Sequence, residues 1–181
     1  MTGSGKSTLA ASLSESTGIP WHHVDDLTWK PGWVAVPTDE QRRRIEEICA
    51  RPEWILDTAY ATWLDVPLSR AQVIIGLDYP RWLSFQRLVR RTVRRQIDRR
   101  PICNGNRETL RGMLSTDSIL LWHFRSFSRK RRRIRQWWND PSALPLVRLS
   151  RTRQTASLLA DVRHGRDLDI RETPRDAPRL T

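Results

Sequence analysis

Short apolar runs and longer amphipathic segments alternate along the chain. The apolar runs predict buried strands, which cover residues 21–26, 54–57, 73–78 and 146–149. The amphipathic segments, in which apolar side chains recur every three or four positions, predict helices over residues 6–16, 38–51, 81–100, 116–138 and 152–162. Because strands and helices take turns, the pattern predicts an α/β fold with parallel strands.

The segment 38–51 shows how such a helix is expected to begin and pack. Thr38 is the predicted N-cap, and acidic residues follow it in the first turn, where they favour the helix N-terminus. The side chains expected to face the core are Ile45, Ile48 and Cys49.

The segment 81–100 combines an apolar face with a stripe of arginines. The apolar face, which we expect to pack against the core, comprises Trp82, Phe85, Val89, Val93 and Ile97. Arg87, Arg91 and Arg94 follow one another at i, i+4 and i+7 and therefore share another side of the helix. This stripe is suited to binding phosphate groups, and a solvated helix face is the alternative.

The start of the chain carries the strongest chemical signal. Gly-Lys-Ser at the opening of a helix is the second half of a P-loop, whose backbone N–H groups surround phosphates. Glycine allows a positive φ and a close approach of the backbone to phosphate. The residues expected to hold the β- and γ-phosphates of ATP are Gly3, Ser4, Gly5, Lys6, Ser7 and Thr8, with Ser7 also on Mg²⁺. The alternative is an ordinary helix N-terminus with incidental glycines.

The loop is incomplete in this sequence. The full motif has another glycine five residues before Lys6, a position that falls before Met1. The strand that would lead into the loop falls there too, so the first strand is expected to be truncated, with the natural start upstream of Met1.

Carboxylates follow two of the predicted strands. The carboxyl ends of parallel strands face the ligand crevice of an α/β sheet, so Asp25 and Asp57 are candidate site residues. Asp57 is the best candidate for binding Mg²⁺ through its water shell beside Ser7. Asp25 is the candidate for orienting or deprotonating an acceptor hydroxyl. His22 and His23 are weak metal-ligand candidates, because neighbouring residues on a strand point to opposite faces.

The charge of the chain is strongly basic. Its formal net charge is +12, and only Lys6, Lys30 and Lys130 among its 32 basic residues are lysines, which leaves 29 arginines. Arginine suits bidentate phosphate contacts, although codon usage in a GC-rich genome also produces such a bias. The densest run, Arg129–Arg133, suggests contacts with a nucleic-acid backbone, but no nucleic-acid module accompanies it.

Length and composition predict one domain over residues 1–162 and a charged, disordered tail over 163–181. No apolar run is long enough to span a bilayer and no signal peptide precedes the loop, so we expect a cytoplasmic protein without membrane contact, as a monomer or dimer. The two cysteines carry no metal-ligand spacing.

Several motifs together resemble one family. They are Gly-Ser-Gly-Lys-Ser-Thr from Gly3 to Thr8, His23-Val24-Asp25, Trp29-Lys30-Pro31-Gly32-Trp33, Trp54-Ile55-Leu56-Asp57, Leu77-Asp78-Tyr79-Pro80 and Asn104-Gly105-Asn106-Arg107-Glu108. In this order they resemble the bacterial topology modulation proteins, which are P-loop proteins similar to adenylate kinases, over residues 1–162. The resemblance implies a three-layer P-loop NTPase fold of the nucleoside monophosphate kinase type, with ATP and Mg²⁺ as cofactors.

The resemblance also implies roles for two arginines. Adenylate kinases have arginines seven and eleven residues after the proline of an Asp-x-Pro motif, and counting from Pro80 these positions are Arg87 and Arg91. Both are expected to hold the transferring phosphoryl group. The chain departs from the family at Asp57-Thr58-Ala59-Tyr60, where relatives have Asp-Gly-Asn-Tyr, and it lacks the usual arginine for a nucleoside monophosphate.

Taken together, the sequence predicts an ATP-dependent phosphotransferase with a nucleotide and an unknown small-molecule acceptor as its partners. Its catalytic residues would be Lys6, Asp25, Arg87 and Arg91. Two other classes stay open: a nucleotide-dependent protein that binds nucleic acid through Arg129–Arg133, and a degenerate P-loop protein that no longer binds ATP.

Overall fold

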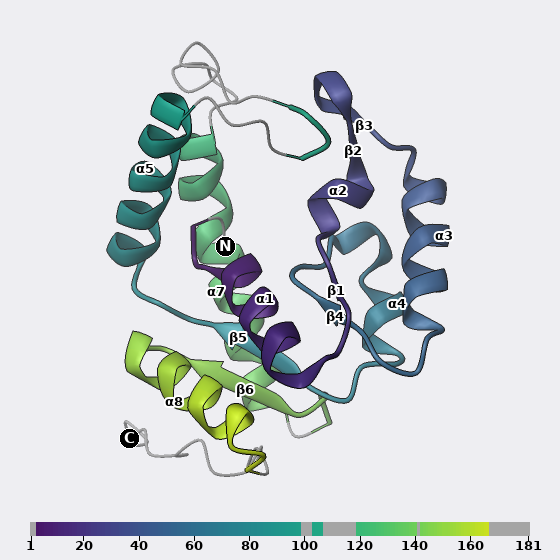
Figure 1. The fold of residues 1–181 in the computed structure, drawn as a ribbon, viewed down its shortest axis with the longest axis vertical. Coiled ribbons are helices and arrows are strands. Elements are labelled where there is room, and N and C mark those ends of the chain that lie inside the picture. The colour runs from purple at the N-terminus through teal and green to yellow at the C-terminus, as the bar shows by residue number, and fades with distance from the viewer. Residues whose placement is uncertain (1–2, 99–102, 107–118, 141, 167–181) are drawn as a thin grey trace.

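A computed structural model describes residues 3–98, 103–106, 119–140 and 142–166 of the 181-residue chain. In these ranges the α-helices are α1 (Lys6–Thr17), α2 (Val24–Thr28), α3 (Thr38–Cys49), α4 (Asp65–Leu68), α5 (Arg81–Asp98), α7 (Ile119–Asn139) and α8 (Thr152–Arg163) (Figure 1). The strands are β1 (Trp21–His22), β2 (Trp29–Lys30), β3 (Val34–Ala35), β4 (Ile55–Leu56), β5 (Ile74–Leu77) and β6 (Leu146–Leu149). The protein is therefore a mixed α/β fold, as predicted.

The strands form pairs and not the single sheet that the sequence predicts. Over the described residues β1 pairs with β4 and β5 pairs with β6, both in parallel, while β2 and β3 form a short antiparallel hairpin. Parallel pairing of the predicted strands is thus confirmed, and their union in one sheet is not observed.

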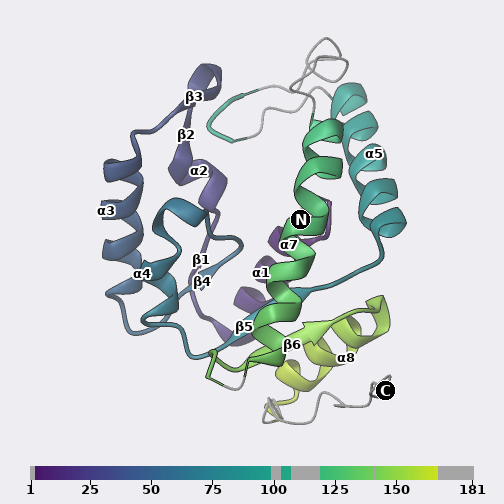
Figure 2. The same cartoon turned by 180° about the vertical axis from the view of Figure 1, so that it is seen from behind.

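Helices cover both faces of the β5–β6 pair. On one face α7 packs closely: a Cβ added to Gly76 would lie 2.9 Å from Cγ2 of Ile134. On the other face α1 and α8 contribute side chains to one apolar cluster with the strands (Figures 1 and 2). This cluster contains Leu9, Leu13, Leu77, Tyr79, Val147, Leu149 and Leu158. A larger residue at position 76 would collide with Ile134 unless this side chain or α7 shifted.

A second apolar cluster lies beyond the β1–β4 pair, under α3 and α4. Ile45 and Cys49, two of the predicted inward residues of α3, belong to this cluster together with Trp63, which has no exposed surface. Ile48, the third predicted inward residue, is also buried. The N-cap of α3 is Pro37, so Thr38 is its first helical residue and the predicted cap is wrong by one position. The helical period of 3.6 residues predicts the buried face of α3 correctly because its apolar residues form one stripe, which is the side that packs against the core.

The predicted strand 21–26 is wrong in its second half. It ends at His22, and α2 begins at Val24, so Asp25 lies on a helix. Asp57 supports this helix start, because its Oδ1 accepts a hydrogen bond from the Val24 backbone N at 3.1 Å. Asp25 and Asp26 occupy the first turn, where acidic side chains stabilise a helix N-terminus.

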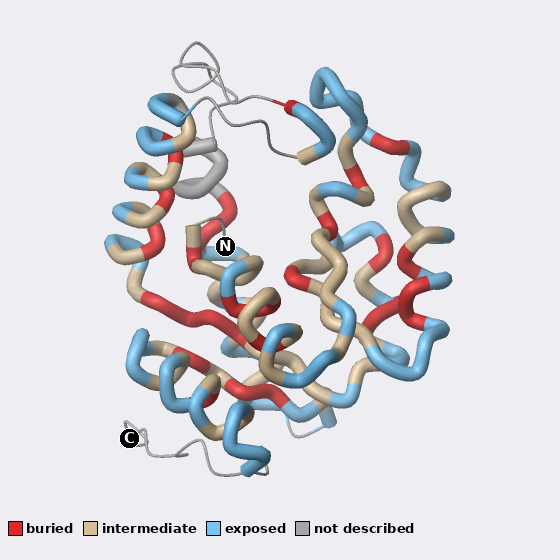
Figure 3. The backbone as a smooth tube through the Cα atoms, viewed as in Figure 1, coloured by how far each residue is buried: buried red, intermediate tan, exposed pale blue. Residues whose placement is uncertain are grey.

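The predicted inner face of α5 is also wrong. The buried residues of α5 are Ser84, Leu88 and Thr92, whereas Trp82 is 67% exposed and Ile97 is 76% exposed. Figure 3 shows the buried side of α5 turned toward the interior beside α7. The sequence shows an apolar stripe on another side of this helix. The side that is buried carries Ser84, Leu88 and Thr92, and Gly3 of the glycine loop packs against Ser84 and Leu88.

A buried carboxylate links α7 to the strands. Asp78, whose side chain has no exposed surface, accepts hydrogen bonds from Nε of Arg131 at 2.7 Å, of Arg148 at 2.9 Å and of Arg135 at 3.3 Å. Arg131 and Arg135 come from α7, and Arg148 comes from β6. The predicted strand ending in Asp78 therefore contributes an anchor for the neighbouring elements.

Several predictions fall on residues that the structure does not describe. These are residues 167–181 of the tail that was predicted to be disordered, and Arg107 and Glu108 of the motif Asn104-Gly105-Asn106-Arg107-Glu108. In the described part of the chain, no helix has both the length and the apolar character needed to cross a membrane.

Candidate functional site

The glycine loop leads directly into α1. Gly3 and Gly5 have φ values of 76° and 90°, in the region that glycine adopts without strain. Gly5 is the N-cap of α1 and makes no side-chain cap, and its carbonyl accepts the Leu9 N–H at 2.9 Å. The N-terminus of a 12-residue helix behind a glycine turn is a geometry suited to anions.

Gly3 also lets α5 approach the loop. A Cβ at Gly3 would lie 2.4 Å from the Ser84 carbonyl oxygen and 2.8 Å from Cβ of Leu88. Gly18 has nearly the same φ, 77°, with nothing within 4 Å of such a Cβ. Substituting Gly18 therefore tests the free-energy cost of the left-handed backbone alone, whereas substituting Gly3 adds the cost of a collision with α5.

We expect Gly3→Ala to destabilise the fold by about 2–4 kcal/mol, since about 1–2 kcal/mol of left-handed strain adds to the displacement of α5. Gly18→Ala, the matched control, should cost only the first part. Urea unfolding of both variants measures the difference. Equal losses would show that α5 does not depend on the loop.

Ser7 and Asp57 meet beside the loop, although they are 50 residues apart in sequence. Ser7 Oγ donates a hydrogen bond to Asp57 Oδ2 at 2.5 Å, and Nε2 of His23 lies 3.6 Å from the same oxygen. Asp57 is buried at 8% exposure. These are the two residues that the sequence analysis assigns to Mg²⁺, and hydroxyl and carboxylate oxygens are the ligands that this ion prefers.

Lys6 lies in the field of both predicted carboxylates. Burial lowers the pKa of its ammonium group, the negative charges of Asp57 and Asp25 raise it, and Arg91 adds a smaller lowering. Asp25 accepts a hydrogen bond from the Tyr60 hydroxyl at 2.9 Å. Burial, followed by the charge of Asp25, raises the pKa of Tyr60, so this hydroxyl stays protonated and donates the hydrogen bond to Asp25.

The two predicted arginines reach the loop from α5. Nη1 of Arg87 donates to the Ser4 carbonyl oxygen at 3.4 Å, and its guanidinium stacks over the Tyr79 ring at 5.1 Å. Arg91, one turn further on, is close enough to Lys6 to influence its pKa. By contrast, Arg94 is directed to solvent with its side chain 80% exposed.

Lys130 is a site residue that the sequence analysis assigned differently. Burial lowers its pKa to about 8, the charges of Lys6 and Arg129 add to the lowering, and Asp25 opposes it. A partly buried lysine on α7 therefore lies within electrostatic range of Lys6. In the sequence, Lys130 differs from its neighbours only as the one lysine in a run of arginines, and this does not indicate toward which part of the protein its side chain points.

The basic run Arg129–Arg133 does not form one face. Lys130 is partly buried within electrostatic range of Lys6, Arg131 binds the buried Asp78, and Arg133 stacks over the Trp137 ring. Only Arg129 and Arg132 of the run are classed as exposed. Helical geometry disperses five consecutive charges around the axis.

The short described segment 103–106 docks on the region after β1. The Asn104 side-chain amide donates to the carbonyl oxygens of Asp26 and Trp29, each at 2.7 Å. The Cys103 Sγ–H donates to the Asp25 carbonyl oxygen at 3.1 Å, and burial together with the nearby aspartates raises the pKa of this thiol to about 12. The segment therefore fixes the turn that carries Asp25.

The structure brings the predicted phosphate, metal and catalytic residues to one end of α1, with Asp25 supplied by α2 and the arginines by α5. The described residues contain no group of three or more His, Cys, Asp and Glu side chains that could hold a metal ion. An ion here would need oxygens from a ligand in addition to Ser7 and Asp57. A scan against protein-family models finds no match, and searches of curated proteins and of solved structures find none either.

Proposed function

We propose that this protein binds ATP with Mg²⁺ and transfers the γ-phosphoryl group to a small acceptor. The observation that carries the proposal is the contact between Ser7 and Asp57 at the head of α1. A hydroxyl next to a carboxylate, beside a glycine loop and a lysine, is the arrangement that P-loop phosphotransferases use for a metal-bound nucleotide.

The surrounding charges support a polyanionic ligand. Lys6, Lys130, Arg87 and Arg91 approach the loop, while the nearby carboxylates are Asp25 and Asp57. The surplus positive charge suits the phosphates of ATP. Mg²⁺, when bound by Ser7 and Asp57, would neutralise part of the charge of the β- and γ-phosphates.

The chain's own residues would then act mainly by position and charge. Lys6 and the two arginines stabilise the negative charge of the transferring group, and the loop N–H groups orient it. Asp25, held by Tyr60, accepts the proton of the acceptor hydroxyl.

Calorimetric titration with ATP and Mg²⁺ tests the proposal. We expect Lys6→Ala to weaken binding about 10- to 100-fold, because a hydrogen bond to a charged group contributes about 1.5–3 kcal/mol. Lys30→Ala is the matched control, since Lys30 is half exposed and lies 3.9 Å from Glu40. A wild-type protein that binds no ATP, or equal affinities for both variants, would overturn the proposal.

A further inference from the structure

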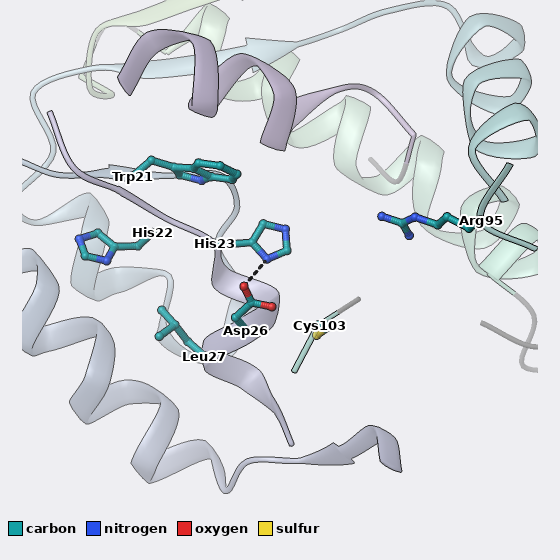
Figure 4. Close-up of a pocket in the computed structure, with 7 residues that line it drawn as sticks. All are labelled: Trp21, His22, His23, Asp26, Leu27, Arg95 and Cys103. Atoms are coloured by element: carbon teal, nitrogen blue, oxygen red, sulfur yellow. Dashed lines mark ion pairs between the residues drawn. The ribbon is translucent and has the colours of Figure 1, made fainter. Parts of the chain in front are cut away.

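A cavity of about 560 Å³ adjoins the candidate site on the side of α2 (Figure 4). It lies between β1, the first turn of α2, the C-terminal half of α5 and the docked segment 103–106. The residues that matter for its chemistry are Trp21, His23, Asp26, Arg95 and Cys103. Asp25, the proposed proton acceptor, directly precedes the lining residue Asp26 in the first turn of α2, so the candidate site and the cavity share this turn.

The two sides of this cavity offer opposite polar chemistry. On the side of α2, Asp26 presents a carboxylate, and its Oδ2 lies 3.2 Å from His23 Nδ1. On the opposite side, Arg95 extends from α5 toward α2 (Figure 4). An acceptor of hydrogen bonds thus faces a cationic donor across the space.

An indole adds a second donor. Trp21 Nε1 is buried and has no hydrogen-bond partner among the described residues. An indole N–H can only donate, and a buried donor without a partner costs about 1–3 kcal/mol. A ligand oxygen would remove this cost. The ring of His23 stands edge-on to the indole at 5.6 Å, whereas His22 points to the other side of the strand, as its position next to His23 predicted.

We propose that this cavity binds the phosphoryl acceptor, and that the acceptor is an alcohol with an anionic group at its other end. The anion faces Arg95, and the hydroxyl faces Asp25 and Asp26. This inference rests on the proposed function, because it names the acceptor class for the same site.

The carboxylates decide which acceptor atom reacts. A phosphate oxygen as nucleophile would be repelled by Asp25 and Asp26, whereas a hydroxyl donates to them. In the transfer, the hydroxyl oxygen forms a bond to the γ-phosphorus of ATP, and the bond from that phosphorus to the β–γ bridging oxygen breaks. ADP leaves with the electron pair, and the hydroxyl proton passes to Asp25.

Binding of matched probes, measured by isothermal calorimetry, tests the class. The probes are ribitol, ribonate, ribitol 5-phosphate and inorganic phosphate, so that the hydroxyl chain and the type of anion vary separately. We expect one or both anionic alcohols to bind at least about 10-fold more tightly than ribitol and than inorganic phosphate, as one charge-assisted contact allows. Ribonate and ribitol 5-phosphate distinguish a carboxylate from a phosphate as the anion.

Variants locate the binding. Arg95→Gln should remove the preference for the anionic alcohol, whereas Arg94→Gln, on the exposed side of the same helix, should keep it. Failure of both anionic alcohols to bind, equal binding of ribitol, or an unchanged preference in Arg95→Gln would overturn the proposal.

Lys6→Ala separates this inference from the proposed function. It should keep the binding of the anionic alcohol and lose that of ATP, while Arg95→Gln should do the reverse. If the alcohol binds and ATP does not, the phosphotransferase proposal fails and the cavity remains a site. If Lys6→Ala also removes the alcohol, the probe occupies the glycine loop and the cavity proposal is wrong.

Discussion

Replacing Asp57 by Asn should remove the part of ATP binding that depends on Mg²⁺, with a loss of about 10- to 100-fold, the range seen when a group that orients a metal is removed. The amide keeps the size of the side chain, and its oxygen can still accept the hydrogen bond from the Val24 backbone that starts α2. It lacks the negative charge that attracts the ion next to Ser7. Binding of ATP without Mg²⁺ should change much less.

The measurement is calorimetric titration with ATP in the presence of Mg²⁺ and again with EDTA. Asp39→Asn is the matched control, because Asp39 lies in the exposed first turn of α3. Ser7→Ala should reproduce part of the effect. If Asp57→Asn binds ATP with the same gain on adding Mg²⁺ as the wild type, the carboxylate does not serve the metal.

Replacing Asp78 by Asn should destabilise the fold by about 2–4 kcal/mol. Removing one partner of a buried ion pair costs about 3–5 kcal/mol, and we reduce this because the three arginines keep 29–49% of their side-chain surface exposed. The amide nitrogen of Asn would also face a guanidinium N–H, so that two donors oppose each other.

Urea unfolding measures this loss against Asp65→Asn, whose exposed ion pair with Arg42 should contribute much less to stability. Arg135→Gln provides a milder test of the same cluster, because its contact with Asp78 is 3.3 Å long and Arg135 is its most exposed arginine. We expect its cost to lie between those of the two Asp variants. Equal losses for Asp78→Asn and Asp65→Asn would mean that the arginines do not need the buried carboxylate.

The comparison of α3 with α5 explains how far sequence periodicity could predict the core. The face of α3 with Ile45 is apolar and is buried, because this helix is positioned by the burial of its apolar side chains. On α5 the apolar residue Trp82 is exposed and Ser84 is buried. On that side of α5 the backbone of the glycine loop lies close to Ser84 and Leu88, and a bulky side chain in place of Ser84 would keep the loop away from the helix.

The candidate site shows the same division. Lys6 and Ser7 could be proposed as site residues from sequence because the predicted phosphate loop is a local motif whose chemistry depends on spacing along the chain. Asp57 was identified from its place after a strand, and the structure puts it next to Ser7. Lys130 could not be assigned in this way, because the direction of each charge in a basic run depends on how the helix is rotated against its neighbours.

The sequence by itself determined the alternation of helices and strands, the glycine loop at the head of α1 and the types of residue available for phosphate and Mg²⁺. These properties follow from interactions between residues that are close along the chain. Only the tertiary structure decided that Asp25 sits on a helix turn held by Tyr60, that Lys130 lies within electrostatic range of Lys6, and that Arg95 lies across a cavity from Asp26. These juxtapositions join residues far apart in sequence, and they arise from packing, which local periodicity does not encode.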